Sequence, residues 1–319
     1  MDDIVRPSYA APDKRRWPPQ PRVEFVRAAA AAATAPDPAV AALVAQVDPS
    51  RLAASVSSLA AFPTRHSLSP HNVEAARWLR SEFLGLGYDE VSLHDFTVGG
   101  VVRHNVVCTK TGAADPTTFI LIGAHYDSRM SDLDDATAAA PGSDDDASGV
   151  AALLELARLL RPVSTGCSVQ FLAFSGEEQG LVGSTAYAAA ANAQRLNVRL
   201  MINLDMIGHP EDPAHPTIIV ERDMGNTQPG NDAASQREAA RMAAAATTYT
   251  SLLAKLGPIY DSDYMPFEHF GYVCIGAFDG ADDQPFYHST TDTPDKVDRS
   301  FHADVVRMVL ATVLAAAGQ

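Results

Sequence analysis

The sequence predicts an α/β fold, in which helices cover a central sheet as the layers of a sandwich. One observation favours this class, and a second favours a single domain. Short apolar runs of strand length alternate along the chain with longer segments of helical spacing, which is the pattern of layered α/β proteins. The chain has 319 residues, of which 46% are hydrophobic, and this is enough for one large core. We therefore expect a single domain over residues 48–319, preceded by an arm over residues 1–47.

The segment 1–47 differs in composition from the rest of the chain. Prolines interrupt an alanine-rich stretch whose helical signals are weak, so we expect an arm that is partly disordered. The alternative is a lid or inhibitory segment that crosses a functional site.

Regular periodicity begins after this segment. Apolar residues recur at helical spacing from Leu52 to Leu59 and again from Ala75 to Leu84, which predicts two amphipathic helices followed by a strand near residues 90–97. Further strands are expected at 104–109, 118–124, 168–174, 199–204, 217–221 and 272–277. Further helices are expected at 147–161, 180–192, 233–256 and 301–317.

Polar residues follow three of these strands at the point where each strand ends. His125 follows strand 118–124, Glu177 and Glu178 follow strand 168–174, and Asp205 follows strand 199–204. In open α/β sheets, ligands bind outside the carboxyl ends of the strands, because the loops there converge over a crevice. We therefore expect these side chains to lie close together.

Three adjacent acids occupy a glycine-bracketed turn at residues 142–149, before an Ala/Leu-rich helix. Adjacent carboxylates repel one another unless they share a cation or a hydrogen-bond network. Taken singly, an acidic turn, a His-x-Asp pair or two acids that open a helix are usually ordinary loop and cap features. Their combination at one edge of the sheet predicts a pair of bound divalent ions.

A physical model assigns the ligands. One carboxylate of the acidic turn bridges two ions, His125 and Asp205 complete the first site, and Glu178 and His288 complete the second. Imidazole and carboxylate ligands without thiolate suit Zn²⁺, with Mn²⁺ or Co²⁺ as substitutes. The residues alone do not choose among the three acids of the turn.

Two acids remain beside these ligands. Asp127 stands two residues after His125 and is placed to accept the proton on the other ring nitrogen of that histidine. Glu177 stands next to a ligand without being needed as one, and a carboxylate beside metal-bound water is suited to act as general base.

Five segments carry a resemblance to a known family: residues 123–128, 142–149, 175–184, 203–206 and 287–289. They resemble the co-catalytic dizinc aminopeptidases of the bacterial leucine aminopeptidase type, a family that also holds glutamate carboxypeptidase and the glutaminyl cyclases. The likeness extends from about Asp48 to the C-terminus.

The resemblance implies a zinc exopeptidase-like fold, a three-layer α/β/α sandwich with a mixed, mostly parallel central sheet. It implies that Asp145 is the bridging ligand and that its bond to Asp146 is a cis peptide. By the same likeness Glu177 is the general base, Asp127 the acid that supports the histidine ligand, and Tyr287 the hydroxyl that stabilises the oxyanion.

The implied activity is that of an aminopeptidase, which hydrolyses the N-terminal peptide bond of a peptide with a hydroxide held by two zinc ions. We expect an apolar first side chain to be favoured, with Met206, Ile207, Phe267 and Phe278 around the cleft. In one segment the sequence departs from the family pattern Ser-Asp-His-x-Pro-Phe, because residues 262–267 read Ser-Asp-Tyr-Met-Pro-Phe. That segment lines the substrate pocket, so the change bears on substrate preference.

Other functions compete with this interpretation. A glutaminyl-cyclase-like acyltransferase would use a single zinc ion, and a carboxypeptidase or dipeptidase would share the family's site. A binding module that has lost its catalytic residues is less favoured, because every ligand position and the base are present. A serine hydrolase is disfavoured because the chain has no Gly-x-Ser-x-Gly elbow.

Composition limits the partners. The formal net charge is −15, which argues against a nucleic-acid partner, because phosphate binding needs clustered basic residues. The apolar run 308–317 is too short to span a bilayer, so we expect no membrane partner. The partner that the family resemblance implies is a peptide substrate. Oligomeric state is left open.

Cysteine usage and the start of the chain bear on the compartment. Cys108, Cys167 and Cys274 lack paired spacing and stand near strand-like residues, so we expect buried free thiols. The first residues have no apolar stretch of signal-peptide type. This predicts a cytoplasmic protein, or a secreted one if a leader has been removed.

Overall fold

The computed structural model describes residues 35–318. Within them the strands are β1 (Val91–Val98), β2 (Val101–Lys110), β3 (Asp115–His125), β4 (Cys167–Phe174), β5 (Asn197–Leu204), β6 (Thr217–Arg222), β7 (Leu253–Pro258) and β8 (Cys274–Phe278). The helices are α1 (Pro38–Val44), α2 (Pro49–Ala60), α3 (Pro70–Gly85), α4 (Ala147–Leu160), α5 (Val182–Ala193), α6 (Asp232–Tyr249), α7 (Met265–His269) and α8 (Arg299–Ala317), with a 3-10 turn, η2, at Pro294–Lys296.

The strands form one sheet with the order β1-β2-β4-β3-β5-β8-β6-β7. Its four central strands, β4, β3, β5 and β8, run parallel to one another. Strand β2 is antiparallel to β1 and β4, and β6 is antiparallel to β8. The mixed, mostly parallel sheet is therefore confirmed, and the carboxyl ends of its four central strands meet at one edge.

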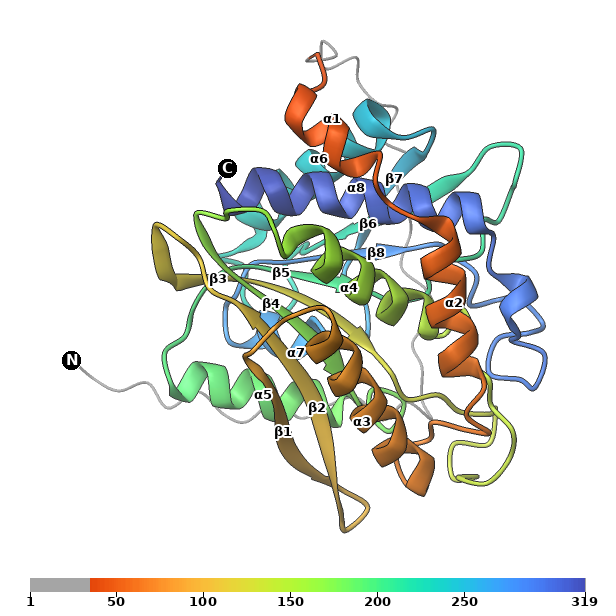
Figure 1. The fold of residues 1–319 in the computed structure, drawn as a ribbon. Coiled ribbons are helices and arrows are strands. Elements are labelled where there is room, and N and C mark those ends of the chain that lie inside the picture. The colour runs from red at the N-terminus through yellow and green to blue at the C-terminus, as the bar shows by residue number, and fades with distance from the viewer. Residues whose placement is uncertain (1–34, 319) are drawn as a thin grey trace.

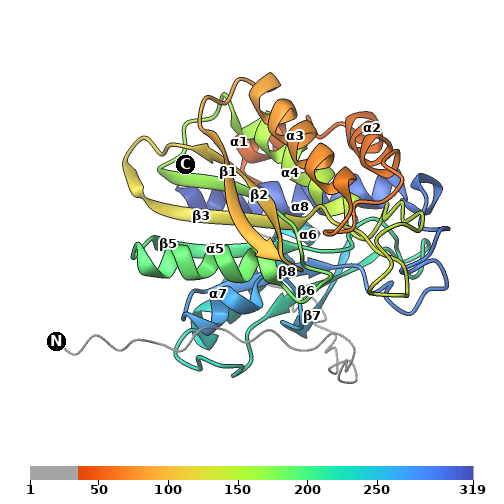
Figure 2. The same ribbon diagram turned by 90° about the horizontal axis from the view of Figure 1, so that it is seen from below.

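Helices cover both faces of this sheet (Figure 1). In the view of Figure 2, α2, α3 and α4 lie on one side of the sheet, while α5 and α7 lie on the other. Alternate residues of β3 divide between two buried clusters: Ile120 and Ile122 face the first group of helices, and Leu121 faces the second. This alternation follows from the two-residue period of a strand, and it confirms the three-layer sandwich.

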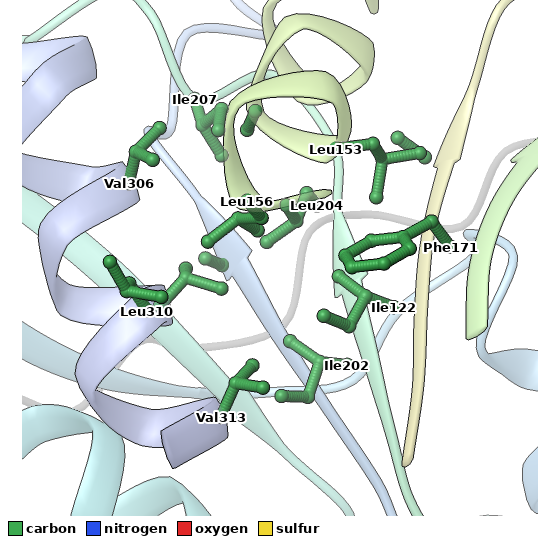
Figure 3. Close-up of a cluster of buried hydrophobic side chains, with 14 of the residues drawn as sticks. Ile122, Leu153, Leu156, Phe171, Ile202, Leu204, Ile207, Val306, Leu310 and Val313 are labelled. Atoms are coloured by element: carbon green, nitrogen blue, oxygen red, sulfur yellow. The ribbon is translucent and has the colours of Figure 1, made fainter. Parts of the chain in front are cut away.

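The larger core lies between the sheet and helices α4 and α8. Figure 3 shows Ile122 and Ile202 of the sheet packed near Leu156 of α4 and Leu310 of α8. All four side chains are fully buried. Burial of one such side chain stabilises a fold by about 1.5–3 kcal/mol, so this core fixes the sheet edge that carries the polar residues.

One predicted helix is wrong at its C-terminal end. The segment 233–256 forms α6 only as far as Tyr249, and Leu253–Pro258 forms strand β7. Thr250 has extended dihedral angles, φ −140° and ψ 179°, and β7 then pairs with β6 in parallel register. The pairing supplies backbone hydrogen bonds that the local sequence pattern does not reveal.

Part of the expected arm is folded. Residues 38–44 form α1, whose N-terminus is capped by the Asp37 side chain through the N–H groups of Ala39 and Val40. Val44 and Val47 are buried, and α1 lies beside α8 (Figure 1). The domain therefore includes at least residues 37–47. The remainder of the predicted arm, residues 1–34, lies outside the described residues, as does the lid alternative.

Helix α8 is a core helix despite its membrane-like composition. Among the described helices it alone is long and apolar enough to cross a bilayer, and 78% of its most apolar window is buried inside the protein.

The prediction for the cysteines is confirmed, since Cys108, Cys167 and Cys274 are buried free thiols.

Candidate metal centre

The carboxyl edge of the central strands gathers the predicted site residues. His125 is the last residue of β3, Glu178 lies in the loop after β4, and Asp205 directly follows β5. Asp145 comes from the turn that precedes α4, and His288 from the loop between β8 and α8. The structure thus brings together five side chains that lie far apart in the sequence.

Asp145 lies between the two histidines. Its Oδ1 is 3.1 Å from Nε2 of His125, and its Oδ2 is 2.9 Å from Nε2 of His288. Asp205 Oδ1 lies 3.4 Å from the His125 nitrogen, and Glu178 Oε1 lies 3.2 Å from the His288 nitrogen. Each histidine therefore has one carboxylate of its own and shares the carboxylate of Asp145 with the other.

The donor set fits divalent cations. Nε2 of His288 is buried and makes no hydrogen bond, although two carboxylate oxygens lie within 3.2 Å of it. The ligand atoms of Asp145, Glu178 and His288 all lie within 4.8 Å of one another. Burial and Glu178 act to raise the pKa of Asp145, but its contacts with both histidines outweigh them and lower this pKa to about 2. The carboxylate is thus ionised, as a ligand must be.

The three acids of the turn have separate environments. Asp144 Oδ1 accepts the N–H of Gly208 at 2.9 Å. Asp146 accepts the N–H of His125 at 3.1 Å and caps α4 through the N–H of Gly149 at 2.9 Å. An Asp146 oxygen is also within ligand range of His125 and Asp205, but backbone donors already occupy both of its oxygens. Only Asp145 faces both histidines, and its bond to Asp146 is cis, as the resemblance implied.

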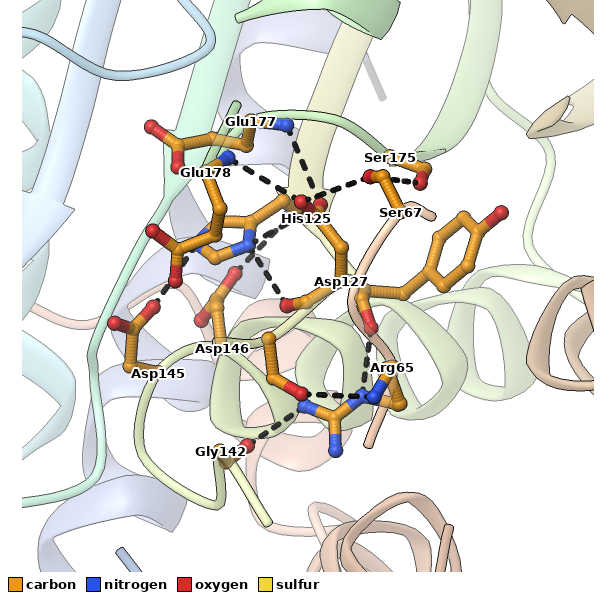
Figure 4. A network of polar contacts seen from close by, with 12 residues as sticks. Arg65, Ser67, His125, Asp127, Gly142, Asp145, Asp146, Ser175, Glu177 and Glu178 are labelled. Carbon is orange, nitrogen blue, oxygen red and sulfur yellow. Dashed lines mark hydrogen bonds and ion pairs between the residues drawn. The ribbon is translucent and has the colours of Figure 1, made fainter. Parts of the chain in front are cut away.

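The carboxylate of Asp127 lies beside the other ring nitrogen of His125, and it makes hydrogen bonds to a neighbouring turn as well. Its Oδ1 is 3.6 Å from Nδ1 of His125, whereas its own carbonyl oxygen is 3.2 Å from that nitrogen. The carboxylate also accepts the N–H groups of Glu177 at 3.3 Å and Glu178 at 3.2 Å, as drawn in Figure 4. The carbonyl oxygen of Asp127 orients the imidazole of His125. The carboxylate of Asp127 orients the turn that carries Glu177 and Glu178, which follows the neighbouring strand β4.

Sequence reasoning missed two arginines near the centre. Nε of Arg129 donates to Oε2 of Glu178 at 2.6 Å. Burial acts against the charge of Arg129, but the neighbouring Glu178 outweighs it and raises the pKa of the guanidinium. No spacing rule links the two residues; a lone arginine after His125-Tyr126-Asp127-Ser128 was the only available signal.

Arg65 lies fully buried beneath the acidic turn (Figure 4). It donates to the backbone carbonyls of Tyr126 at 2.6 Å, Gly142 at 2.8 Å and Leu59 at 3.0 Å. Burial lowers its pKa to about 10, and nearby carboxylates oppose this effect. Arg65 therefore ties the acidic turn to the end of β3, and the residues around it in sequence give no sign of this role.

A cavity of about 60 Å³, open to solvent, lies beside the centre. Its lining residues are His125, Asp145, Glu177, Glu178, Asp205, Met206, Glu221, Tyr260, Asp261, Tyr264, Phe278, Asp282 and Tyr287. The predicted cleft residues Met206 and Phe278 are among them. Ile207 and Phe267 are not, since both are fully buried in the two cores. That part of the prediction is wrong because the loop after β5 and helix α7 turn these side chains inward.

Tyr287 borders the cavity next to His288. Its ring stacks on the imidazole, with centroids 3.6 Å apart and planes 28° apart. Burial raises the pKa of Tyr287 well above its usual value, and the charges of Asp145 and Glu178 raise it further. The hydroxyl is therefore protonated at neutral pH and can donate a hydrogen bond into the cavity.

The model of peptidase family M28 matches residues 105–313. A probable zinc metalloprotease of Pyricularia oryzae is 36% identical over 212 residues, which cover 60% of this chain and 41% of that protein. A second one, from Phaeosphaeria nodorum, is 35% identical over 206 residues, which cover 54% and 42%. The chain thus spans about two fifths of the length of these curated relatives.

Solved structures share the fold. LapB from Legionella pneumophila superimposes with a TM-score of 0.75 at 22% identity, covering 89% of this chain and 76% of that one. An aminopeptidase from Aneurinibacillus sp. strain AM-1 gives 0.70 at 20% identity, with 86% and 95% covered. A glutaminyl cyclase from Bacteroides thetaiotaomicron gives 0.68 at 18% identity, with 84% and 98% covered. Because the family model matches well over half of the sequence, the chain belongs to peptidase family M28.

Proposed function

We propose that this protein is a zinc-dependent aminopeptidase that hydrolyses the N-terminal peptide bond of peptides. The observation that carries the proposal is the carboxylate of Asp145, which faces His125 with one oxygen and His288 with the other. Such an arrangement suits a carboxylate that bridges two metal ions. The probable zinc metalloproteases among the relatives support zinc as the metal, with Mn²⁺ or Co²⁺ as substitutes.

Five residues would hold two zinc ions. His125 and Asp205 would hold one ion and Glu178 and His288 the other, and Asp145, which lies close to both histidines, would be shared between them. When bound, zinc lowers the pKa of coordinated water and polarises the carbonyl of the scissile bond. The three carboxylates of Asp145, Glu178 and Asp205 would offset most of the formal charge of two divalent ions.

The other residues move protons and stabilise charge. Glu177 takes a proton from the attacking water and delivers it to the departing amine. Asp127 holds the backbone N–H of Glu177, which fixes the turn that presents this base to the cavity. The hydroxyl of Tyr287 donates a hydrogen bond to the carbonyl oxygen as negative charge develops there.

The charge of the cavity favours an aminopeptidase over a carboxypeptidase. Seven acidic side chains line it and, among the described residues, no lysine or arginine does. A substrate's free α-amino group is attracted by such a surface, with Glu177 and Asp205 as its nearest partners, whereas a C-terminal carboxylate is repelled.

The proposal is tested by measuring metal content together with substrate specificity. Mass spectrometry of the purified protein should find two zinc ions per chain. Aminoacyl-p-nitroanilides with a free amino group should be hydrolysed, while their N-acetylated counterparts should not. Hydrolysis of the blocked substrates alone would overturn the aminopeptidase assignment and leave the metal centre standing.

A glutaminyl-cyclase-like acyltransferase is the second candidate, because glutaminyl cyclases are among the structural neighbours. It predicts one zinc ion per chain and cyclisation of peptides that begin with glutamine. The shared position of Asp145 between two histidines favours two ions and thus the peptidase.

A further inference from the structure

Part of the cavity beside the metal centre is formed by residues that are not among the proposed metal ligands. This part, called here the acidic subsite, is lined by Glu221 of β6, Tyr264 of the segment before α7, Phe278 at the end of β8 and Asp282 of the loop that follows. Met206, which directly follows the proposed metal ligand Asp205 in sequence, also lines the cavity. None of these residues takes part in the metal binding or the proton transfers proposed above.

Glu221 occupies an unusual place for a carboxyl group, on the inner part of the sheet. Its register partner on β8 is Gly276, which pairs on its other side with Asn203 of β5. A side chain at Gly276 would collide with Oε2 of Glu221 and with the ring of Tyr264. The glycine thus leaves a space above the central strands, and the carboxyl group of Glu221 fills it.

One oxygen of this carboxyl group is satisfied and the other is not. The hydroxyl of Tyr264 donates to Oε1 at 2.7 Å and is itself held by the N–H of Tyr260 at 2.8 Å. Oε2 has no hydrogen bond or ion pair within residues 35–318, and Glu221 is only 6% exposed. A carboxylate oxygen that has no protein partner and lines a cavity, on a side chain that is otherwise buried, can accept a hydrogen bond from a bound ligand.

We propose that the acidic subsite receives the side chain of the substrate's first residue and selects a cationic one, lysine or arginine. This inference rests on the proposed aminopeptidase function. If the free α-amino group lies at Glu177 and Asp205, the first side chain leaves from the same carbon and must enter the adjoining part of the cavity. Its aliphatic stem then passes Met206 and Phe278, and its charged end reaches Oε2 of Glu221.

Charge supports the same choice. Within the described part of the chain, neither Glu221 nor Asp282 forms an ion pair with a basic side chain, and the metal ions are already balanced by other acids. Burial raises the pKa of Glu221 well above its usual value, and the negative charges of Asp205 and Asp282 raise it further. The hydrogen bond from Tyr264 acts in the opposite direction. A cationic side chain would stabilise the ionised form of Glu221, which burial disfavours. An apolar side chain would leave this carboxyl group without a partner.

Tyr264 connects the acidic subsite to the sequence. It stands where the chain departs from the family pattern Ser-Asp-His, and its hydroxyl fixes Glu221. The departure therefore places a neutral donor on one oxygen of Glu221 and leaves the other for substrate. This replaces the expectation of an apolar first side chain, which depended partly on Ile207 and Phe267.

The test compares substrates that differ only in the charged end. The zinc-loaded protein is assayed with lysyl- and norleucyl-p-nitroanilide, and with arginyl- and citrullyl-p-nitroanilide. We expect kcat/KM to be at least about tenfold higher for lysine than for norleucine, the size of effect that one charge-assisted contact gives. In Glu221→Gln this ratio should fall about tenfold. In Glu82→Gln, a matched change at an exposed position of α3, the ratio should stay unchanged. This control shows whether the effect comes from a contact in the cavity or from the loss of one negative charge anywhere on the protein.

The outcomes distinguish the two proposals. If the parent protein cleaves norleucine as fast as lysine, the acidic subsite is refuted while the aminopeptidase assignment stands. If the zinc-loaded protein cleaves none of the four substrates, the proposed function fails and the subsite fails with it. Should Glu221→Gln not fold by circular dichroism, Asp282→Asn takes its place; a ratio that is unchanged in that variant also overturns the inference.

Discussion

Arg129 donates from its Nε to Oε2 of Glu178 at 2.6 Å, while the other oxygen of the same carboxylate lies 3.2 Å from Nε2 of His288. The arginine thus holds one oxygen of Glu178 and turns the second toward the position of a metal ion. A ligand that is oriented in advance binds metal more tightly, because less side-chain freedom is lost on binding.

Replacing Arg129 with alanine should weaken the binding of one zinc ion by about 10- to 100-fold, which is the usual effect of removing a group that orients a ligand. The affinity of the other ion should change less, because His125 and Asp205 have no contact with Arg129. Competition with a zinc-binding dye measures both steps. Arg241→Ala, at an exposed arginine paired with Glu238 on α6, serves as the control. Equal affinities in the parent and Arg129→Ala would show that the contact does not orient the ligand.

Replacing Glu177 with glutamine should leave the zinc content intact and lower kcat by at least about 100-fold, because general bases contribute about 10²–10⁴ to a rate. The amide keeps the size of the side chain but cannot accept the proton of the attacking water. Activity on an aminoacyl-p-nitroanilide and zinc content by mass spectrometry are measured on the same sample. A variant that keeps activity within about tenfold of the parent would exclude Glu177 as the base.

Replacing Tyr287 with phenylalanine should lower kcat about 10²- to 10³-fold with a small change in KM, as expected for a donor that acts mainly on the oxyanion. The ring remains, so its stacking on His288 and the position of that ligand are preserved. Steady-state kinetics separates the two constants. An effect confined to KM would instead assign Tyr287 to ground-state binding.

The stability of the protein should fall at acid pH partly because of His302. Burial lowers the pKa of this histidine from 6.5 to about 4, against the hydrogen bond from its ring to the carbonyl of Ser148. Since the unfolded chain binds the proton first, the free energy of unfolding decreases as pH falls from about 6.5 towards 4. The full shift of the His302 pKa corresponds to a loss of about 3 kcal/mol in the free energy of unfolding.

Urea unfolding at pH 7.5 and pH 4 measures this effect. In His302→Gln, whose amide can still donate to the carbonyl of Ser148, the loss between the two pH values should be smaller than in the parent. Carboxylates elsewhere contribute equally to both proteins and cancel in the comparison. Identical losses would show that His302 is not buried in its neutral form.

The sequence predicted most elements of the fold because each depends on local spacing. All seven expected strands form, and helices 147–161, 180–192 and 301–317 appear as α4, α5 and α8. The failure at 233–256 has a tertiary cause, because β7 is a strand through its pairing with β6.

The sequence by itself determined which residue types stand at the ends of the buried strands. Since parallel strands end at a common edge, His125, Glu178 and Asp205 had to meet there once the sheet formed. Family resemblance added Asp145 and Tyr287, which the residues alone did not single out.

Only the tertiary structure decided how each polar group is oriented. Backbone donors occupy Asp144 and Asp146 and leave Asp145 for the histidines, while Arg129, Arg65 and Glu221 find partners far away in the sequence. These contacts form between loops and strands that are far apart in sequence and come close only in the folded protein. A short-range sequence pattern does not specify which of these segments will meet. Periodicity and residue type therefore predicted a site rich in carboxylates and imidazoles at this edge of the sheet, whereas the contacts of Arg65 and Arg129 and the place of Glu221 in the cavity required the folded structure.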